Sequence, residues 1–145
     1  MFKLKNVEFN NPQFLQALNL LASKNLPIKV SWNLSRLLRQ CTKLETELRK
    51  KVVSLGDKYF KKNEEGNLTP IMKDDQIVQG HFETKEEGGQ EKFDAEFQDL
   101  LATEVTIESR KLIFSDFENI EFPANQLAVL ENVFDDGEVI PLKSV

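Results

Sequence analysis

The chain has 145 residues, of which 30% are charged and 40% hydrophobic, with a formal net charge of −5 at pH 7. This length and balance are typical of a folded chain with a sizeable core, and we expect a single domain over residues 1–145. No apolar run approaches the roughly 18 residues that a membrane span needs. The N-terminus lacks the apolar segment of a secretory signal, so we expect no membrane partner and a cytoplasmic location.

The charges are distributed unevenly along the chain. Residues 1–62 contain 13 Lys or Arg and 4 Asp or Glu, whereas residues 63–145 contain 6 and 20. The first part therefore carries a balance of +9 and the second a balance of −14. Such a chain can pair its own halves, or it can present two surfaces of opposite sign to different partners.

The N-terminal residues predict a strand followed by a short helix. Residues 2–5 alternate between apolar and basic, and Val7 and Phe9 continue out of phase, as in an edge strand or hairpin arm. Asn11 is placed to cap a helix that begins at Pro12. This helix ends near residues 23–25, because a residue before proline, here Leu26, avoids the helical conformation. Its apolar side consists of Phe14, Leu15, Leu18, Leu21 and Ala22.

A single long helix is predicted from Ser31, the expected N-cap, to about Lys62. Its apolar residues follow steps of three and four, as in helices that pack lengthwise against a partner. At 1.5 Å per residue this helix would be roughly 45 Å long. We interpret Cys41, which lies on this seam, as a small buried hydrophobic residue. The seam consists of Leu34, Leu38, Cys41, Leu44, Leu48, Val52, Leu55 and Tyr59.

The same helix carries most of the positive charge and is the predicted partner-binding region. The basic residues either form a solvated face that meets acidic neighbours in the chain or contact nucleic acid. We do not favour nucleic acid, because no aromatic residues interleave the basic ones to stack on bases. We expect the C-terminal half, residues 49–62, to be the exposed part. The predicted face consists of Arg36, Arg39, Lys43, Arg49, Lys50, Lys51, Lys58, Lys61 and Lys62.

Residues 63–91 form an acidic region that we predict to be mainly loop. Turns are expected at residues 63–67, at Thr69–Pro70 and at residues 86–90. Between them, residues 77–82 are compatible with a short strand. The one histidine, His81, has no second ligand at metal spacing, so we assign it no metal or catalytic role.

The C-terminal part predicts a second helix, two extended segments and a last helix. The helix at residues 90–102 carries Phe93, Phe97, Leu100 and Leu101 on one side, and we expect it to pack antiparallel to the long helix. Residues 103–107 and 111–114 are the extended segments. The last helix is expected to begin at Pro123, to bury Leu127, Leu130, Val133 and Phe134, and to end at residues 135–137. The predicted fold class is α+β and helix-dominated, with one long central helix, two or three shorter helices and a small antiparallel β element.

Motifs of catalysis are absent from the sequence. There is no glycine-rich phosphate loop, no pair of His or Cys at ligand spacing and no nucleophile elbow. Adjacent acids at Asp74–Asp75 and Asp135–Asp136 are more simply solvated than metal-binding. We therefore expect a protein that is not an enzyme and that has no metal and no cofactor.

Three segments carry a resemblance to known proteins. They are Leu26-Pro27-Ile28-Lys29 with Leu34-Ser35-Arg36-Leu37-Leu38, then Phe97-Gln98-Asp99-Leu100-Leu101 with Thr103-Glu104-Val105, and then Phe122-Pro123-Ala124 with Leu127 and Leu130. This succession resembles a group of small uncharacterised proteins encoded by tailed bacteriophages. The resemblance implies a phage origin, and with it a location in the virion or the host cytoplasm.

Our leading hypothesis is a non-enzymatic protein–protein interaction protein, an accessory structural subunit at the capsid, connector or tail of a phage particle. Its partners would be other protein subunits in a larger assembly. One alternative is a small phage inhibitor of a host enzyme such as RNA polymerase or a defence nuclease, because an acidic half can occupy a basic channel. The other is a nucleic-acid-binding protein that uses the basic helix.

Overall fold

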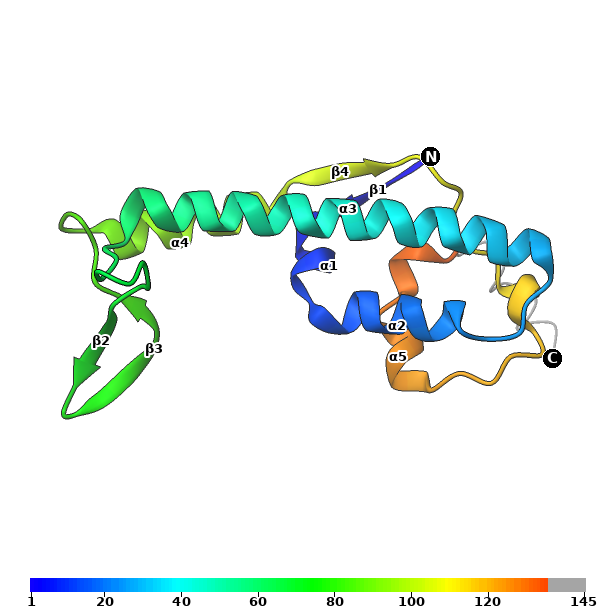
Figure 1. Cartoon of the computed structure of the whole chain (residues 1–145). Coiled ribbons are helices and arrows are strands. Elements are labelled where there is room, and N and C mark those ends of the chain that lie inside the picture. The colour runs from blue at the N-terminus through cyan, green and yellow to red at the C-terminus, as the bar shows by residue number, and fades with distance from the viewer. Residues whose placement is uncertain (136–145) are drawn as a thin grey trace, which may run out of the picture. The chain divides into compact units, whose positions relative to one another are not determined.

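The structure is a computed structural model that describes residues 1–135. The fold is α+β and helix-dominated, as predicted, with one long helix, several shorter helices and small antiparallel sheets (Figure 1). The chain forms two compact units. Unit 1 consists of Met1–Thr46 and the chain from Thr103 onward, and unit 2 consists of Glu47–Ala102. The expectation of a single domain stays a prediction.

Unit 1 combines a two-stranded sheet with short helices and the first half of the long helix, α3 (Ile28–Tyr59). Its sheet pairs the first strand antiparallel to the last, with Phe2 opposite Ile107. Its other elements are β1 (Phe2–Lys5), α1 (Asn6–Asn10), α2 (Pro12–Ala22), β4 (Glu104–Ile107), η1 (Phe114–Phe117), α5 (Ala124–Ala128) and η2 (Glu131–Val133).

The prediction that Val7 and Phe9 continue the first strand is wrong, because they lie in α1. The backbone N–H of Asn6 donates to the carbonyl of Thr103 at 2.9 Å, and the chain then coils. The coil turns Phe9 inward, where it is buried and meets the Phe14 ring edge-on at 5.7 Å. A helix of five residues is too short to show periodicity in the sequence.

The cap of α2 is confirmed. The backbone N–H of Gln13 donates to Oδ1 of Asn11 at 3.0 Å, and Pro12 occupies the first helical position. The helix buries Phe14 and Leu18 as predicted. After Ala22 the chain turns, and α3 runs in the opposite direction (Figure 1).

The predicted start of the long helix at Ser31 is wrong by one turn. The helix begins at Ile28, and the N–H of Ser31 already donates to the carbonyl of Pro27 at 2.9 Å. Helix α2 ends at Ala22, well before Pro27, and Pro27 is tolerated directly before α3 because the first turn of a helix leaves its backbone N–H groups without intrahelical partners. The helix also ends earlier than predicted, at Tyr59, and Phe60 and Lys62 instead form β-bridges.

The seam of α3 is buried or half-buried along its whole length, as the spacing predicts. In unit 1 Leu34 and Cys41 are fully buried, and so is Leu37, which the sequence analysis did not assign. In unit 2 Leu48 and Tyr59 are buried. The expectation that the C-terminal half would be the exposed part is therefore wrong for the seam.

The C-terminal part of unit 1 is less regular than predicted. The backbone N–H of Leu112 donates to the carbonyl of Val133 at 2.7 Å, and Leu112 forms a β-bridge with Phe134. The extended segment predicted at residues 111–114 is shorter than expected, because Phe114 begins η1. The predicted last helix is divided into α5 and η2. Its apolar residues nevertheless enter the core, with Leu130, Val133 and Phe134 buried. The predicted end at residues 135–137 lies partly outside the described residues, since Asp136 and Gly137 are not described.

Unit 2 consists of the second half of α3, a hairpin of β2 (Pro70–Lys73) and β3 (Gln76–Phe82), and α4 (Gly89–Ala102). The short strand expected within residues 77–82 is confirmed as β3, whereas the turn expected at Thr69–Pro70 is wrong, because Pro70 begins β2. The hairpin turns instead at Asp74 and Asp75, whose φ angles are 52° and 63°. Two positive φ angles define the tight turn that suits the twist of a hairpin.

Helix α4 lies alongside the second half of α3 and runs antiparallel to it, as predicted (Figure 1). Nζ of Lys58 lies 3.3 Å from Oε1 of Glu96, and the rings of Phe60 and Phe93 lie 4.6 Å apart. Phe82 of the hairpin meets Phe60 edge-on at 5.5 Å. Phenylalanine rings therefore join the three elements of unit 2.

Candidate functional site

One face of the first half of α3 combines large apolar and basic side chains in solvent. We call it the outer face. Steps of three or four residues join Ile28, Trp32, Arg36, Arg39 and Lys43, and Lys29 lies three residues before Trp32, so these side chains project from the same side of the helix, opposite the buried seam. The outer face consists of Ile28, Lys29, Trp32, Arg36, Arg39 and Lys43, all of which are exposed.

The centre of the outer face is Trp32, the only tryptophan of the chain. Trp32 is 66% exposed, and Ile28, one turn earlier, is 89% exposed. Single exposed apolar residues are ordinary, but two large ones one turn apart form a patch. The expectation that no aromatic residue interleaves the basic ones is wrong, because Trp32 lies between Lys29 and Arg36. The four-residue steps from Ile28 to Trp32 and from Trp32 to Arg36 are the sequence signal of this patch.

The outer face has a single sign of charge. Residues 28–44 contain Lys29, Arg36, Arg39 and Lys43 and no acidic residue. Within the described part of the chain, none of these four forms an ion pair. Their charge is therefore available to a partner.

The remaining predicted basic residues lie in unit 2 and are exposed, but several already have partners. Lys58 pairs with Glu96, and Lys62 pairs with Asp57. Arg49, Lys50 and Lys51 have no exposed aromatic residue at a four-residue step, so the predicted basic face is not uniform.

The Lys58–Glu96 pair also involves Tyr59. The pKa of the Glu96 carboxyl is lowered mainly by the Tyr59 hydroxyl and to a smaller extent by Lys58. Tyr59, followed by Glu96, raises the pKa of Lys58. Both side chains are partly exposed, at 60% for Lys58 and 43% for Glu96, so the pair sets the register of α3 and α4 more than it stabilises them.

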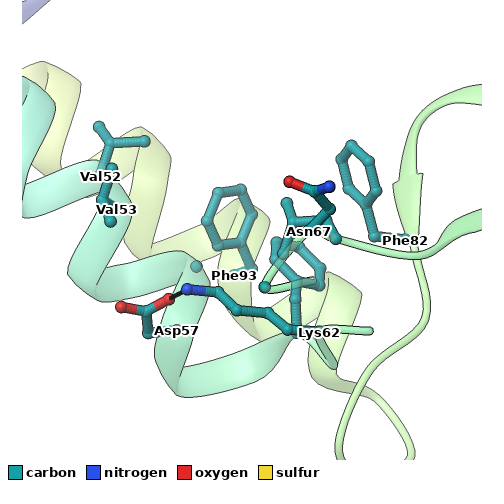
Figure 2. Close-up of a pocket in the computed structure, with 11 residues that line it drawn as sticks. Val52, Val53, Asp57, Lys62, Asn67, Phe82 and Phe93 are labelled. Atoms are coloured by element: carbon teal, nitrogen blue, oxygen red, sulfur yellow. Dashed lines mark ion pairs between the residues drawn. The ribbon is translucent and has the colours of Figure 1, made fainter. Parts of the chain in front are cut away.

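Unit 2 also contains an open cavity of about 450 Å³ (Figure 2). Val52 and Val53 of α3 lie on one side, Phe82 lies on the other, and Phe93 of α4 lies between them (Figure 2). The apolar lining consists of Val52, Val53, Phe60, Leu68, Phe82 and Phe93.

The polar lining of the cavity is sparse. Asp57 and Lys62 form an ion pair with each other, which Figure 2 marks with a dashed line. The side-chain amide of Asn67 makes no hydrogen bond within the described residues. The cavity is therefore apolar and carries no net charge.

The described residues hold no group of three His, Cys, Asp or Glu side chains that could bind a metal ion. His81 is exposed on β3, Asp74 and Asp75 form the hairpin turn, and Asp136 lies outside residues 1–135. Cys41 is fully buried, and burial raises its pKa to about 12, which confirms its interpretation as a hydrophobic residue. Within residues 1–135, no helix is long and apolar enough to cross a membrane.

No family model, curated protein or solved structure matches the chain. The resemblance to phage proteins therefore stays a prediction.

Proposed function

We propose that the protein is a non-enzymatic interaction protein, an accessory structural subunit of a phage particle, that binds an acidic surface of another protein subunit. The observation that carries this proposal is the outer face of α3, where exposed Trp32 and Ile28 lie among four basic residues that form no ion pair within residues 1–135. Tryptophan and arginine are the residues most enriched at the energetic centres of protein interfaces.

The energetics favour an apolar anchor within a basic rim. A tryptophan side chain buries about 150–250 Å² at an interface, so covering the exposed two-thirds of Trp32 contributes about 3 kcal/mol. The basic residues contribute mainly to the rate and specificity of encounter with an acidic partner. The partner therefore needs an apolar recess surrounded by carboxylates.

The phage particle enters the proposal through the sequence resemblance, and it has its own test. Mass spectrometry of purified particles from the phage that carries the gene should detect the chain at a fixed ratio to a structural subunit. Absence from washed particles would contradict the virion location. It would favour instead the alternative of an inhibitor in the host cytoplasm that uses its acidic half.

Nucleic-acid binding is a second candidate, and Trp32 favours it more than the sequence did, because an aromatic ring among cations can stack on a base. Two features oppose it. The net charge of −5 repels a polyanion, and Ile28 offers nothing to a phosphate. A labelled single-stranded oligonucleotide tests this candidate by fluorescence anisotropy, since contact by four cations predicts a slope of log affinity against log salt of about −2.8. No binding at low salt would exclude it.

A further inference from the structure

The cavity of unit 2 supports a second binding activity, separate from the outer face. We propose that it binds a small uncharged aromatic molecule. All of its lining residues belong to unit 2, and none belongs to the outer face. Its volume of about 450 Å³ lies within the roughly 300–1,000 Å³ of small-molecule sites.

The first argument is the glycine in the wall of the cavity. Gly56 lies in the last turns of α3, where glycine costs a helix about 0.5–1 kcal/mol relative to alanine. A Cβ at this position would meet only Cδ2 of Phe60, at an ordinary 3.8 Å. Neither packing nor a positive φ in this chain requires glycine here. Its effect is to keep the wall of the cavity open.

The second argument is the chemistry of the walls. Three phenyl rings face the cavity, and Phe60 contacts both Phe82 and Phe93. Offset and edge-to-face contacts with these rings favour an aromatic guest.

The third argument is charge. The Asp57 carboxylate and the Lys62 ammonium neutralise each other at the cavity, so an ionic guest would lose its hydration without gaining a free counter-ion. The free amide of Asn67 can hydrogen-bond one polar group of an uncharged guest.

The test uses a matched pair of fluorescent probes and the full chain. N-phenyl-1-naphthylamine is uncharged, and 8-anilinonaphthalene-1-sulfonate has the same ring system with an added sulfonate. We expect saturable one-to-one binding of the uncharged probe and at least about tenfold weaker binding of the anionic one. Two variants complete the design: Gly56→Leu fills the cavity, and Gly56→Ala raises helix propensity in the same way but leaves most of the space.

The variants should separate in a defined way. Gly56→Ala should keep the affinity for the uncharged probe, whereas Gly56→Leu should lose at least about tenfold while its circular dichroism spectrum and melting temperature are retained. Trp32→Ala should bind the probe as the unmodified chain does, because Trp32 lies in unit 1. Equal affinity in Gly56→Leu, equal binding of both probes, or no binding to the unmodified chain would overturn the proposal. If Gly56→Leu does not fold, Phe93→Ala is the replacement test, and it should weaken binding of the uncharged probe because it removes one aromatic wall. An unchanged affinity of Phe93→Ala for the probe would overturn the proposal.

Discussion

At the scale of single residues, two glycines of unit 2 should respond in opposite ways to the same substitution. Gly56→Ala should raise the free energy of unfolding by about 0.5–1 kcal/mol, because the helix gains propensity and the new Cβ meets only ordinary contact. Gly89→Ala should lower it by about 1–3 kcal/mol, because its Cβ would lie 2.7 Å from Cβ of Thr84. Urea titration of both variants measures this. A stabilised Gly89→Ala would contradict the packing at the start of α4.

Cys41 provides a second test at the residue scale. Its side chain is fully buried, and burial raises the pKa of its thiol to about 12, so almost no thiolate exists at neutral pH. We expect Ellman's reagent to react with the native chain only as fast as the chain unfolds, and to react at once in denaturant. Rapid reaction of the native chain would show that the seam of unit 1 opens.

At the scale of elements, the backbone of the turn in the β2–β3 hairpin is strained, and this can be tested. Asp74 and Asp75 both have positive φ, a conformation that costs a side-chain residue about 1–2 kcal/mol and that Asn-Gly adopts readily. The double variant Asp74→Asn with Asp75→Gly should stabilise the hairpin by about 1 kcal/mol. Amide exchange in β2 and β3 should slow accordingly, while exchange in unit 1 stays unchanged. Unchanged exchange in β3 would argue against this turn.

The pairing of α3 with α4 has a pH dependence through Glu96. The pKa of Glu96 is lowered, first by the Tyr59 hydroxyl and then by Lys58. A depressed carboxyl pKa stabilises the fold above the unfolded pKa of about 4.3, and this contribution is lost as the pH falls through the folded value. In an NMR titration, Tyr59→Phe should raise the Glu96 pKa towards its usual range, and Lys58→Met should raise it less. An ordinary value in the unmodified chain would contradict the contact.

Sequence reasoning succeeded for elements where the signal repeats along the chain. Leu34, Leu48 and Tyr59 belong to a seam whose three- and four-residue steps persist for many turns, and Asn11–Pro12 has a local cap chemistry that no tertiary contact has to supply. It failed for elements that are too short to show a repeating pattern in the sequence. Helix α1 is five residues long, and the hairpin turns on two aspartates without a glycine.

The candidate site was predictable only in part, for a physical reason. Positive charge is visible as composition, so the exposed basic residues of α3 were found. Whether an apolar residue is exposed depends on which side of the helix the core covers. Trp32 lies two residues before the buried Leu34, and this offset places it on the opposite side of the helix from the seam. The cavity was not predictable at all, because its walls come from segments that are distant in sequence.

At the scale of the whole molecule, the residues that stabilise the fold and the residues proposed to bind a partner lie on different sides of α3. The core of unit 1 lies on the seam side of α3, and the outer face lies on the other side. Trp32→Ala should therefore change the free energy of unfolding by less than about 0.5 kcal/mol. The same variant should weaken a partner complex by about 2 kcal/mol or more, which is about 30-fold in Kd.

Charge reversal offers a matched comparison on the same helix. Arg36→Glu should slow association strongly and make it less dependent on salt. Lys50→Glu makes the same change in charge on α3 without an exposed tryptophan one turn away, and we expect a smaller effect. Equal effects of the two would mean that only the net charge matters and would contradict a specific outer face.

The most direct measurement rests on the proposed phage origin and places a photoreactive p-benzoylphenylalanine at position 32 of the full chain, expressed in phage-infected cells. The control places it at Gln16, an exposed position of α2 in the same unit. We expect one discrete protein adduct from position 32, reduced by Arg36→Glu with Arg39→Glu, and none of that adduct from position 16. Equal adducts from both positions, insensitivity to the charge reversals, or a nucleic-acid adduct would contradict an acidic protein partner at the outer face.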